Sequence, residues 1–483
     1  MSDIDYAKLK FKSGLEIHQQ LDTHKLFCDC PSILRNDEPD FLVERKLHAV
    51  AGESGEIDKA AEYQASLKKT FVYQGYKNST CLIELDEEPP HEINEEALRI
   101  ALQIALLLNC KIIPITQIMR KTVIDGSNTS GFQRTVLIAR EGYVETDFGK
   151  VGIETICLEE DAARKVKVEG DKVYWNLDRL GIPLIEIATA PDIKSAEQAK
   201  EVALHIGDVL RSCKVKRGIG TIRQDINISI LNGNRIEMKG VQDMKTFIKT
   251  IENEVLRQEK LFNEKKPTKA EVRNSLPDGT SEFLRPMPGA DRMYPETDLP
   301  LLKISRDFIN EIKKDLPKLR SEIAGELKEK GLSEEMIKLI LSEDKIEELK
   351  SFVDIYPNIN FTAKMIILFP KEIATKENKS LKNIEEKIVE YYGDILRLLN
   401  KKKISEGDVK EILIKIVKGK NFEEAIKMEK ADTSEIEGEV LKIIKEKPGL
   451  NANAYMGLVM SKFKGKINGK EAMEIINKLV NKK

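Results

Sequence analysis

Residues 225–239 (DINISILNGNRIEMK) decide the architecture of the first half of this 483-residue chain. Apolar and polar residues alternate on both sides of Asn232-Gly233, and two alternating runs around Asn-Gly predict a β-hairpin. One face of this hairpin is apolar, and the other carries Asp225, Asn227, Ser229, Glu237 and Lys239. We therefore expect antiparallel strands with one face in a core and one polar face.

Two other stretches repeat this alternation with charged residues on the polar face. In residues 15–18 (LEIH), Glu16 and His18 share one strand face, because side chains alternate between the two faces. In residues 183–188 (PLIEIA), Glu186 is the only charge in an apolar run. A carboxylate in such a run needs a partner.

Three consecutive carboxylates end a further expected strand at residues 157–161 (CLEED). Like charges so close repel unless a cation or a basic group lies among them. Carboxylates with one imidazole suit a hard or borderline cation. One reading is a Mg²⁺ site that grips ATP phosphates, and the other is a set of ordinary solvent-facing strands. The candidate ligands are Glu16, His18, Glu186 and one of Glu159 or Glu160.

Overall composition excludes few partners but does exclude a membrane span. The chain has 79 basic and 81 acidic side chains, so any nucleic-acid surface must be local. Residues 1–14 lack an apolar signal region, and the longest apolar stretch, near residues 100–115, is interrupted by polar residues. We expect a cytoplasmic protein with no membrane partner.

Six cysteines are scattered along the chain, which favours reduced thiols over a disulfide framework. Cys28, Cys30 and Cys81 can supply three ligands of a zinc site. A structural zinc site needs four, so zinc stays open at this point.

The chain divides by composition. Before residue 300 it indicates short strands with turns around one clear helix at residues 95–109, and beyond it amphipathic helices. A polar break follows at residues 400–403. We predict an α+β chain with a β-rich domain at 1–300, an all-α domain at 301–403 and a small all-α tail domain at 404–483.

Many ordered segments resemble the GatB/GatE family of Glu-tRNA(Gln) amidotransferase subunits, and the archaeal GatE branch most of all. The resemblance runs over roughly residues 12–300 and continues more loosely to the end. The segments that carry it are residues 14–22 (GLEIHQQLD), 25–28 (KLFC), 78–81 (NSTC), 84–91 (ELDEEPPH), 158–162 (LEEDA), 183–187 (PLIEI), 190–193 (APDI), 285–289 (RPMPG), 293–298 (MYPETD) and 451–458 (NANAYMGL).

This resemblance implies a cradle-shaped catalytic domain, a helical domain and a tail domain, and an ATP-dependent ligase. ATP would phosphorylate the γ-carboxylate of tRNA-bound glutamate, and ammonia would displace the phosphate to give Gln-tRNA(Gln). By family position, the implied metal ligands are Glu16, His18, Glu160 and Glu186, with Glu159 adjacent. The implied catalytic residues are Lys121, Lys239 and Asp225, and the implied nucleotide contacts are Lys121 and Asn227.

Two further expectations concern partners. We find no amidase nucleophile pattern in the chain, so the resemblance implies an asparaginase-like partner, the D subunit, with two copies of each chain in the assembly. The inserted domain of familiar family members is absent between Asn253 and Thr280. The tail at residues 440–483 has ten lysines and three glutamates, a local charge of +7, and we expect it to dock tRNA(Gln) through phosphate contacts from Lys462, Lys464 and Lys466.

Alternatives stay open. The lysine-rich tail can also be a simple solubilising cluster. The chain can be a GatB-like protein of an enzyme with three different chains, a tRNA-binding paralogue without catalysis, or a metal-dependent nuclease.

Overall fold

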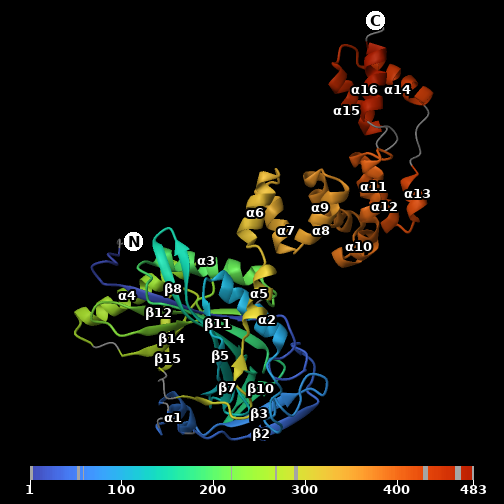
Figure 1. Ribbon diagram of the computed structural model, residues 1–483. Coiled ribbons are helices and arrows are strands. Elements are labelled where there is room, and N and C mark those ends of the chain that lie inside the picture. Colours follow the sequence, from blue (N-terminus) through green and yellow to red (C-terminus); the bar gives the residue numbers. More distant parts are fainter. Residues whose placement is uncertain are drawn as a thin grey trace. The chain divides into compact units, whose positions relative to one another are not determined.

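The computed structural model describes residues 4–49, 51, 55–57, 59–218, 220–266, 269–287, 292–427, 433–462 and 469–480. The chain forms two compact units, Met1–Arg320 and Ser321–Lys483. Strands lie in the first unit, and the second is helical (Figure 1). The predicted α+β class, with a β-rich part followed by helices, is confirmed.

A large mixed sheet is the framework of the first unit. Within the described residues it has 11 strands in the order β15-β14-β13-β12-β1-β11-β8-β7-β6-β16, with β4 also paired to β7. Among these described strands only the β13–β14 pair is parallel. The strands are β1 (Lys12–Gln20), β4 (Lys111–Ile112), β6 (Ile118–Thr122), β7 (Phe132–Thr146), β8 (Gly149–Glu160), β11 (Pro183–Thr189), β12 (Ile222–Ser229), β13 (Ile236–Lys239), β14 (Glu271–Ser275), β15 (Ser281–Pro286) and β16 (Met293–Pro295).

The predicted hairpin at residues 225–239 is confirmed as β12 and β13. Ile226 pairs with Met238, and Ile228 pairs with Ile236. These side chains are buried. The turn holds Asn232 at φ 64, a left-handed conformation that asparagine tolerates better than most residues.

Two smaller sheets complete the first unit. One has the order β2-β3-β10-β9 in the described part of the chain, with β3 and β10 parallel. Its strands are β2 (Phe41–Arg45), β3 (Thr70–Gly75), β9 (Arg164–Glu169) and β10 (Lys172–Asn176). The other pairs β5 (Ile115–Thr116) with β17 (Leu302–Lys303).

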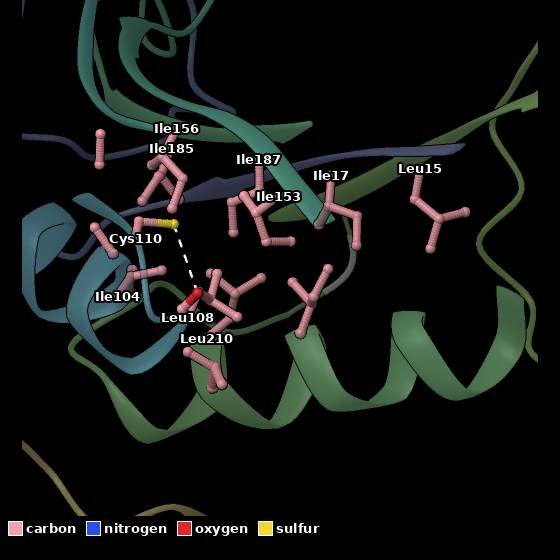
Figure 2. Close-up of a cluster of buried hydrophobic side chains, with 14 of the residues drawn as sticks. Leu15, Ile17, Ile104, Leu108, Cys110, Ile153, Ile156, Ile185, Ile187 and Leu210 are labelled. Carbon is pink, nitrogen blue, oxygen red and sulfur yellow. Dashed lines mark hydrogen bonds between the residues drawn. The ribbon is translucent and has the colours of Figure 1, made fainter. Parts of the chain in front are cut away.

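Helices cover the apolar face of the large sheet. Figure 2 shows Leu15 and Ile17 of β1 and Ile185 and Ile187 of β11 on the side of the sheet that faces the helix carrying Leu210. That helix is α3 (Ala196–Ser212), and α2 (Glu95–Leu107) packs beside it. Because one face of β1 and β11 is buried in this way, the alternating polar residues of both strands must lie on the opposite face.

The predicted helix at residues 95–109 is confirmed as α2, which ends two residues earlier and is capped by Asn94. The expectation of one clear helix before residue 300 is wrong. The described residues there also include α1 (Lys59–Ser66), α3 and α4 (Phe247–Asn263), and α5 (Arg306–Lys314) packs against α2. The first unit therefore continues past the predicted boundary at residue 300, to Arg320.

The second unit has two separate apolar cores among its described residues, one from Leu327 to Ala425 and one from Ile436 to Ile476. The first core continues past the predicted boundary at residue 403, because the helix Glu406–Val417 packs on the helices Ile359–Glu377 and Leu381–Ile388. The helices are α6 (Arg320–Glu329), α7 (Glu334–Ser342), α8 (Ile346–Ile355), α9 (Ile359–Glu377), α10 (Leu381–Ile388), η1 (Val389–Tyr391), α11 (Tyr392–Asn400), α12 (Glu406–Val417), α13 (Phe422–Ile426), α14 (Thr433–Glu446), α15 (Ala452–Lys462) and α16 (Gly469–Val480).

In the part of the chain that the structure describes, no helix has both the length and the apolar character needed to cross a bilayer.

Candidate active site

Strand register brings the polar stripes together on the open face of the large sheet. Glu16 of β1 lies opposite Asp225 of β12, and His18 of β1 lies opposite Glu186 of β11. Directly paired residues share a face. Four side chains that are far apart in the sequence therefore meet on one surface.

His18 lies at the centre of this group. Its Nε2 is 3.3 Å from Glu186 Oε2 and 3.6 Å from Glu16 Oε1. Two overlapping sets of donor atoms, each within 4.8 Å of one another, can hold a metal ion: Glu16, His18 and Asp225 in one, and His18, Glu159 and Glu186 in the other.

Lys121 supplies a positive charge beside Glu159 and Glu186. Its Nζ donates to Glu159 Oε1 at 2.6 Å and to Glu186 Oε2 at 3.4 Å. Burial alone would raise the pKa of Glu186, but Lys121 and His18 hold it well below its ordinary value. Burial, followed by the charge of Glu186, raises the pKa of both Glu16 and Glu159. The site thus has more carboxylates than Lys121 alone can neutralise.

Lys239 forms a second basic contact in the same cleft. Its Nζ is 2.5 Å from Asp225 Oδ2 and 2.7 Å from Glu237 Oε1. Asn227, one alternation further along β12, has an Oδ1 atom with no hydrogen-bond partner among the described residues.

The structure does not bring Glu160 to this group. Successive residues of β8 point to opposite faces, so Glu159 faces Lys121 and Glu160 turns away. Glu160 Oε2 accepts a hydrogen bond from Arg134 N at 3.1 Å, and Arg134 Nε donates to the buried Glu296 at 2.8 Å. Of the two adjacent glutamates, Glu159 lies with the candidate metal ligands, and Glu160 is part of a buried ion network.

Each carboxylate in residues 159–161 has its own basic partner, which is one of the two ways of relieving their repulsion that the sequence left open. Glu159 pairs with Lys121 and Glu160 with Arg134. Asp161 accepts from Arg223 Nη2 at 2.8 Å. Sequence reasoning missed Arg223, because the pair joins residues 62 positions apart.

A cleft of about 750 Å³ contains the candidate site. Its lining includes Glu16, His18, Lys121, Glu159, Glu186, Asp225 and Lys239, together with five further basic residues: Lys69, Lys165, Arg223, Arg285 and Arg292. A cleft lined by basic groups around a carboxylate cluster suits a polyanion held with a cation.

The three cysteines of the open zinc question lie together, and a fourth donor joins them. Cys28, Cys30, Cys81 and Glu84 have donor atoms within 4.8 Å of one another. Interactions with the Cys28 and Cys30 thiols hold the pKa of Cys81 well below its ordinary value. Glu84 also pairs with the fully buried Lys25. Sequence reasoning missed this fourth donor, which the spacing Cys81-x-x-Glu84 could have signalled.

The predicted tRNA contacts fall mostly outside the described part of the chain. Lys464 and Lys466 lie outside the described residues, and Lys462 is the last residue of α15.

Comparisons with known proteins agree on one family. A family model described as the GatB/GatE catalytic domain matches residues 11–310. The chain is 38% identical over 637 residues to the glutamyl-tRNA(Gln) amidotransferase E subunit of Methanocaldococcus jannaschii, with 99% of each chain covered. It is 33% identical over 631 residues to the E subunit of Methanosarcina barkeri, again with 99% of each covered. For the E subunit of Methanothermobacter thermautotrophicus the identity is 34% over 541 residues, covering 85% of this chain and 87% of the relative.

The first of these alignments also bears on the missing insertion. An alignment of 637 positions with a chain of 483 residues leaves at least 154 positions without a residue of this chain. The Methanocaldococcus relative is therefore longer by residues that have no counterpart in this chain, which fits the predicted absence of the inserted domain.

Proposed function

The chain belongs to the GatB/GatE family, and on that premise we propose that it is the GatE component of a Glu-tRNA(Gln) amidotransferase. In this role it activates the γ-carboxylate of tRNA-bound glutamate with ATP and converts it to the amide. The observation that carries the proposal is the convergence of Glu16, His18, Glu159 and Glu186 with Lys121 in one cleft of the family's catalytic domain.

Activation is needed because a carboxylate is a poor electrophile. In the first step a γ-carboxylate oxygen bonds to the γ-phosphorus of ATP, and the bond to ADP breaks. In the second step ammonia bonds to the carbonyl carbon, phosphate leaves with the bonding electrons, and the nitrogen loses a proton. The product is Gln-tRNA(Gln). Both steps crowd negative oxygens together, so catalysis depends on positioning and on positive charge.

The donor set of the cleft fits a magnesium ion. Three carboxylates and one imidazole, without a thiolate, suit a hard cation. Burial, followed by the charge of Glu186, raises the pKa of Glu16 and Glu159, and a cation among these carboxylates would favour their charged forms. Glu16, His18, Glu159 and Glu186 would hold the ion, which supplies charge neutralisation for the nucleotide phosphates.

The basic residues of the cleft act on the phosphates. Ion pairs with Glu159 and Asp225 hold the side chains of Lys121 and Lys239 in place on the sheet. We assign to them the contacts that orient the phosphoryl group and balance its charge. Asn227, whose Oδ1 has no hydrogen-bond partner among the described residues, is assigned a nucleotide contact, and Asp225 holds Lys239 in position.

Ammonia comes from a partner in this proposal. The chain lacks an amidase nucleophile pattern, so an asparaginase-like D subunit would hydrolyse the amide donor, with two copies of each chain in the cytoplasmic assembly. tRNA(Gln) binding would involve the lysine-rich tail.

An amidation assay tests the proposal. The purified chain is incubated with Glu-tRNA(Gln), ATP, Mg²⁺ and ammonium chloride, and the amino acid released from the tRNA is identified. We expect ATP-dependent formation of glutamine. Absence of glutamine from a folded protein that binds the tRNA would contradict the proposal, and shortening of the tRNA would favour the nuclease alternative.

A further inference from the structure

The cleft has a second, unlike wall, on the four-stranded sheet. Val168 of β9 pairs with Val173 of β10, and Val173 pairs with Phe71 of β3. Direct partners lie side by side on one face, so these three side chains form an apolar row across three strands. All three line the cleft that also contains the carboxylates.

Trp175 continues this row. It lies two residues after Val173, on the same face of β10, and it also lines the cleft. Its side chain is 8% exposed, and its indole Nε1 has no hydrogen-bond partner in the described part of the molecule. Thr122, another lining residue, is 5% exposed and likewise has an unpaired hydroxyl there. Buried polar atoms without partners are costly, so these two atoms are available to bond a molecule in the cleft.

The described residues do not close over the cleft beside this wall. Leu67, Val168 and Leu284 line the cleft and remain 40 to 49% exposed. Exposed apolar side chains that gather in a cleft beside convergent polar groups are typical of a small-molecule site.

We propose that this wall is a base subsite, which takes an adenine ring whose attached phosphates lie toward Lys121 and Lys239. The inference rests on the proposed function and adds the residues that recognise the base. Aromatic and apolar side chains suit the flat face of a base, and a cleft of about 750 Å³ has the size of ordinary ligand pockets. The adenine belongs either to ATP or to the 3′-terminal adenosine of the tRNA.

Trp175 is the one tryptophan of the chain, so its fluorescence reports on this wall alone. The full chain is titrated with ADP, adenosine, tripolyphosphate and two oligonucleotides that end in CCA or in CC. We expect ADP and adenosine to change the emission and tripolyphosphate to leave it unchanged. A response to the CCA oligonucleotide but not to ADP or the CC form would assign the ring to the tRNA. Equal responses to ADP and tripolyphosphate, or no response to any adenine, would overturn the subsite.

A matched pair of variants gives a second measurement. Leu67→Ala removes an exposed apolar side chain from the cleft, and Leu42→Ala removes one from outside it, where Leu42 is 56% exposed on β2. Calorimetry uses the adenine probe that changed the Trp175 emission, either ADP or the CCA oligonucleotide. We expect Leu67→Ala to weaken binding of that probe by about fivefold and Leu42→Ala to leave it unchanged. Equal affinities in both variants and the unmodified chain would count against the subsite.

These outcomes are separable from the proposed function. An ADP-dependent fluorescence change in a chain that forms no glutamine would support the subsite and contradict the amidation. Glutamine formation by a chain whose Trp175 emission does not change with any adenine probe would support the amidation and contradict the subsite.

Discussion

Replacing Lys121 by methionine tests the electrostatics of the cleft most directly. The ammonium group lies 2.6 Å from Glu159 and 3.4 Å from Glu186, and the side chains of these three residues are at most 16% exposed. Removing one partner of a buried ion pair leaves an uncompensated charge, which costs about 3–5 kcal/mol. We expect Lys121→Met to lower the free energy of unfolding of the first unit by that amount in metal-free buffer.

The assay is denaturant unfolding followed by Trp175 fluorescence, because this tryptophan lies in the first unit. Lys111→Met is the matched control. Its ion pair with Glu141 is exposed, at 75% and 52%, and exposed pairs contribute less than about 1 kcal/mol. A Lys121→Met protein that is as stable as the Lys111→Met protein would refute the reasoning.

The same variant has a predictable pH response. Burial and Glu186 already raise the pKa of Glu159 above its ordinary value, and Lys121 opposes that rise, so the variant raises it further. A carboxyl group with a raised folded pKa favours the folded state at low pH, and this contribution is lost as pH rises. The loss of unfolding free energy in Lys121→Met, relative to the unmodified protein, should therefore be smaller at pH 5 than at pH 8. Added Mg²⁺ should reduce this loss at pH 8, since a bound cation replaces the lost charge.

Four further outcomes follow from the site and the sequence. Glu186→Gln should abolish ATP-dependent activation, with far-ultraviolet circular dichroism unchanged, and retained activation would exclude Glu186 as a metal ligand. The purified chain should use ammonium but not asparagine or glutamine in the amidation assay, and asparagine-dependent turnover by the chain alone would contradict the need for an asparaginase-like partner. Metal analysis should find about one zinc ion per chain, and the Cys81→Ser protein should lose it. Equal zinc contents in both proteins would exclude the cluster of Cys28, Cys30, Cys81 and Glu84 as the zinc site. Replacing Lys462, Lys464 and Lys466 of the tail by alanine should weaken tRNA(Gln) binding. It should also flatten the slope of log binding constant against log salt concentration by nearly one unit per lysine. An unchanged slope would point to a solubilising tail.

Local patterns in the sequence predicted local structure well. The hairpin at residues 225–239 and the helix α2 both follow from short-range alternation, turn and capping residues. Sequence reasoning missed helix α3, although Ser195 caps it and its apolar residues recur at helical spacing. Its sequence contains more polar residues than that of α2, so its helical pattern is less obvious. The residue types of the candidate site were also visible, since carboxylates and histidine in apolar strands have few structural reasons to be there.

Long-range register was beyond the sequence. Glu159 and Glu160 are adjacent glutamates, and the pairing of Leu184 with Glu159 places Glu159 on the face of the cleft. The apolar wall with Trp175 also needed the pairing of β3, β9 and β10, which come from two distant parts of the chain.

The central position of β1 has a consequence for synthesis of the protein on the ribosome. Its two neighbours in the sheet are β11 and β12, and both are translated more than 160 residues after β1 ends at Gln20. At bacterial or eukaryotic elongation rates that delay is on the order of ten to thirty seconds. During this time Leu15 and Ile17 have no strand partner, and pairing so distant in sequence is slow to form. The nascent chain should therefore depend on a holding chaperone at its N-terminal segment until β12 has emerged.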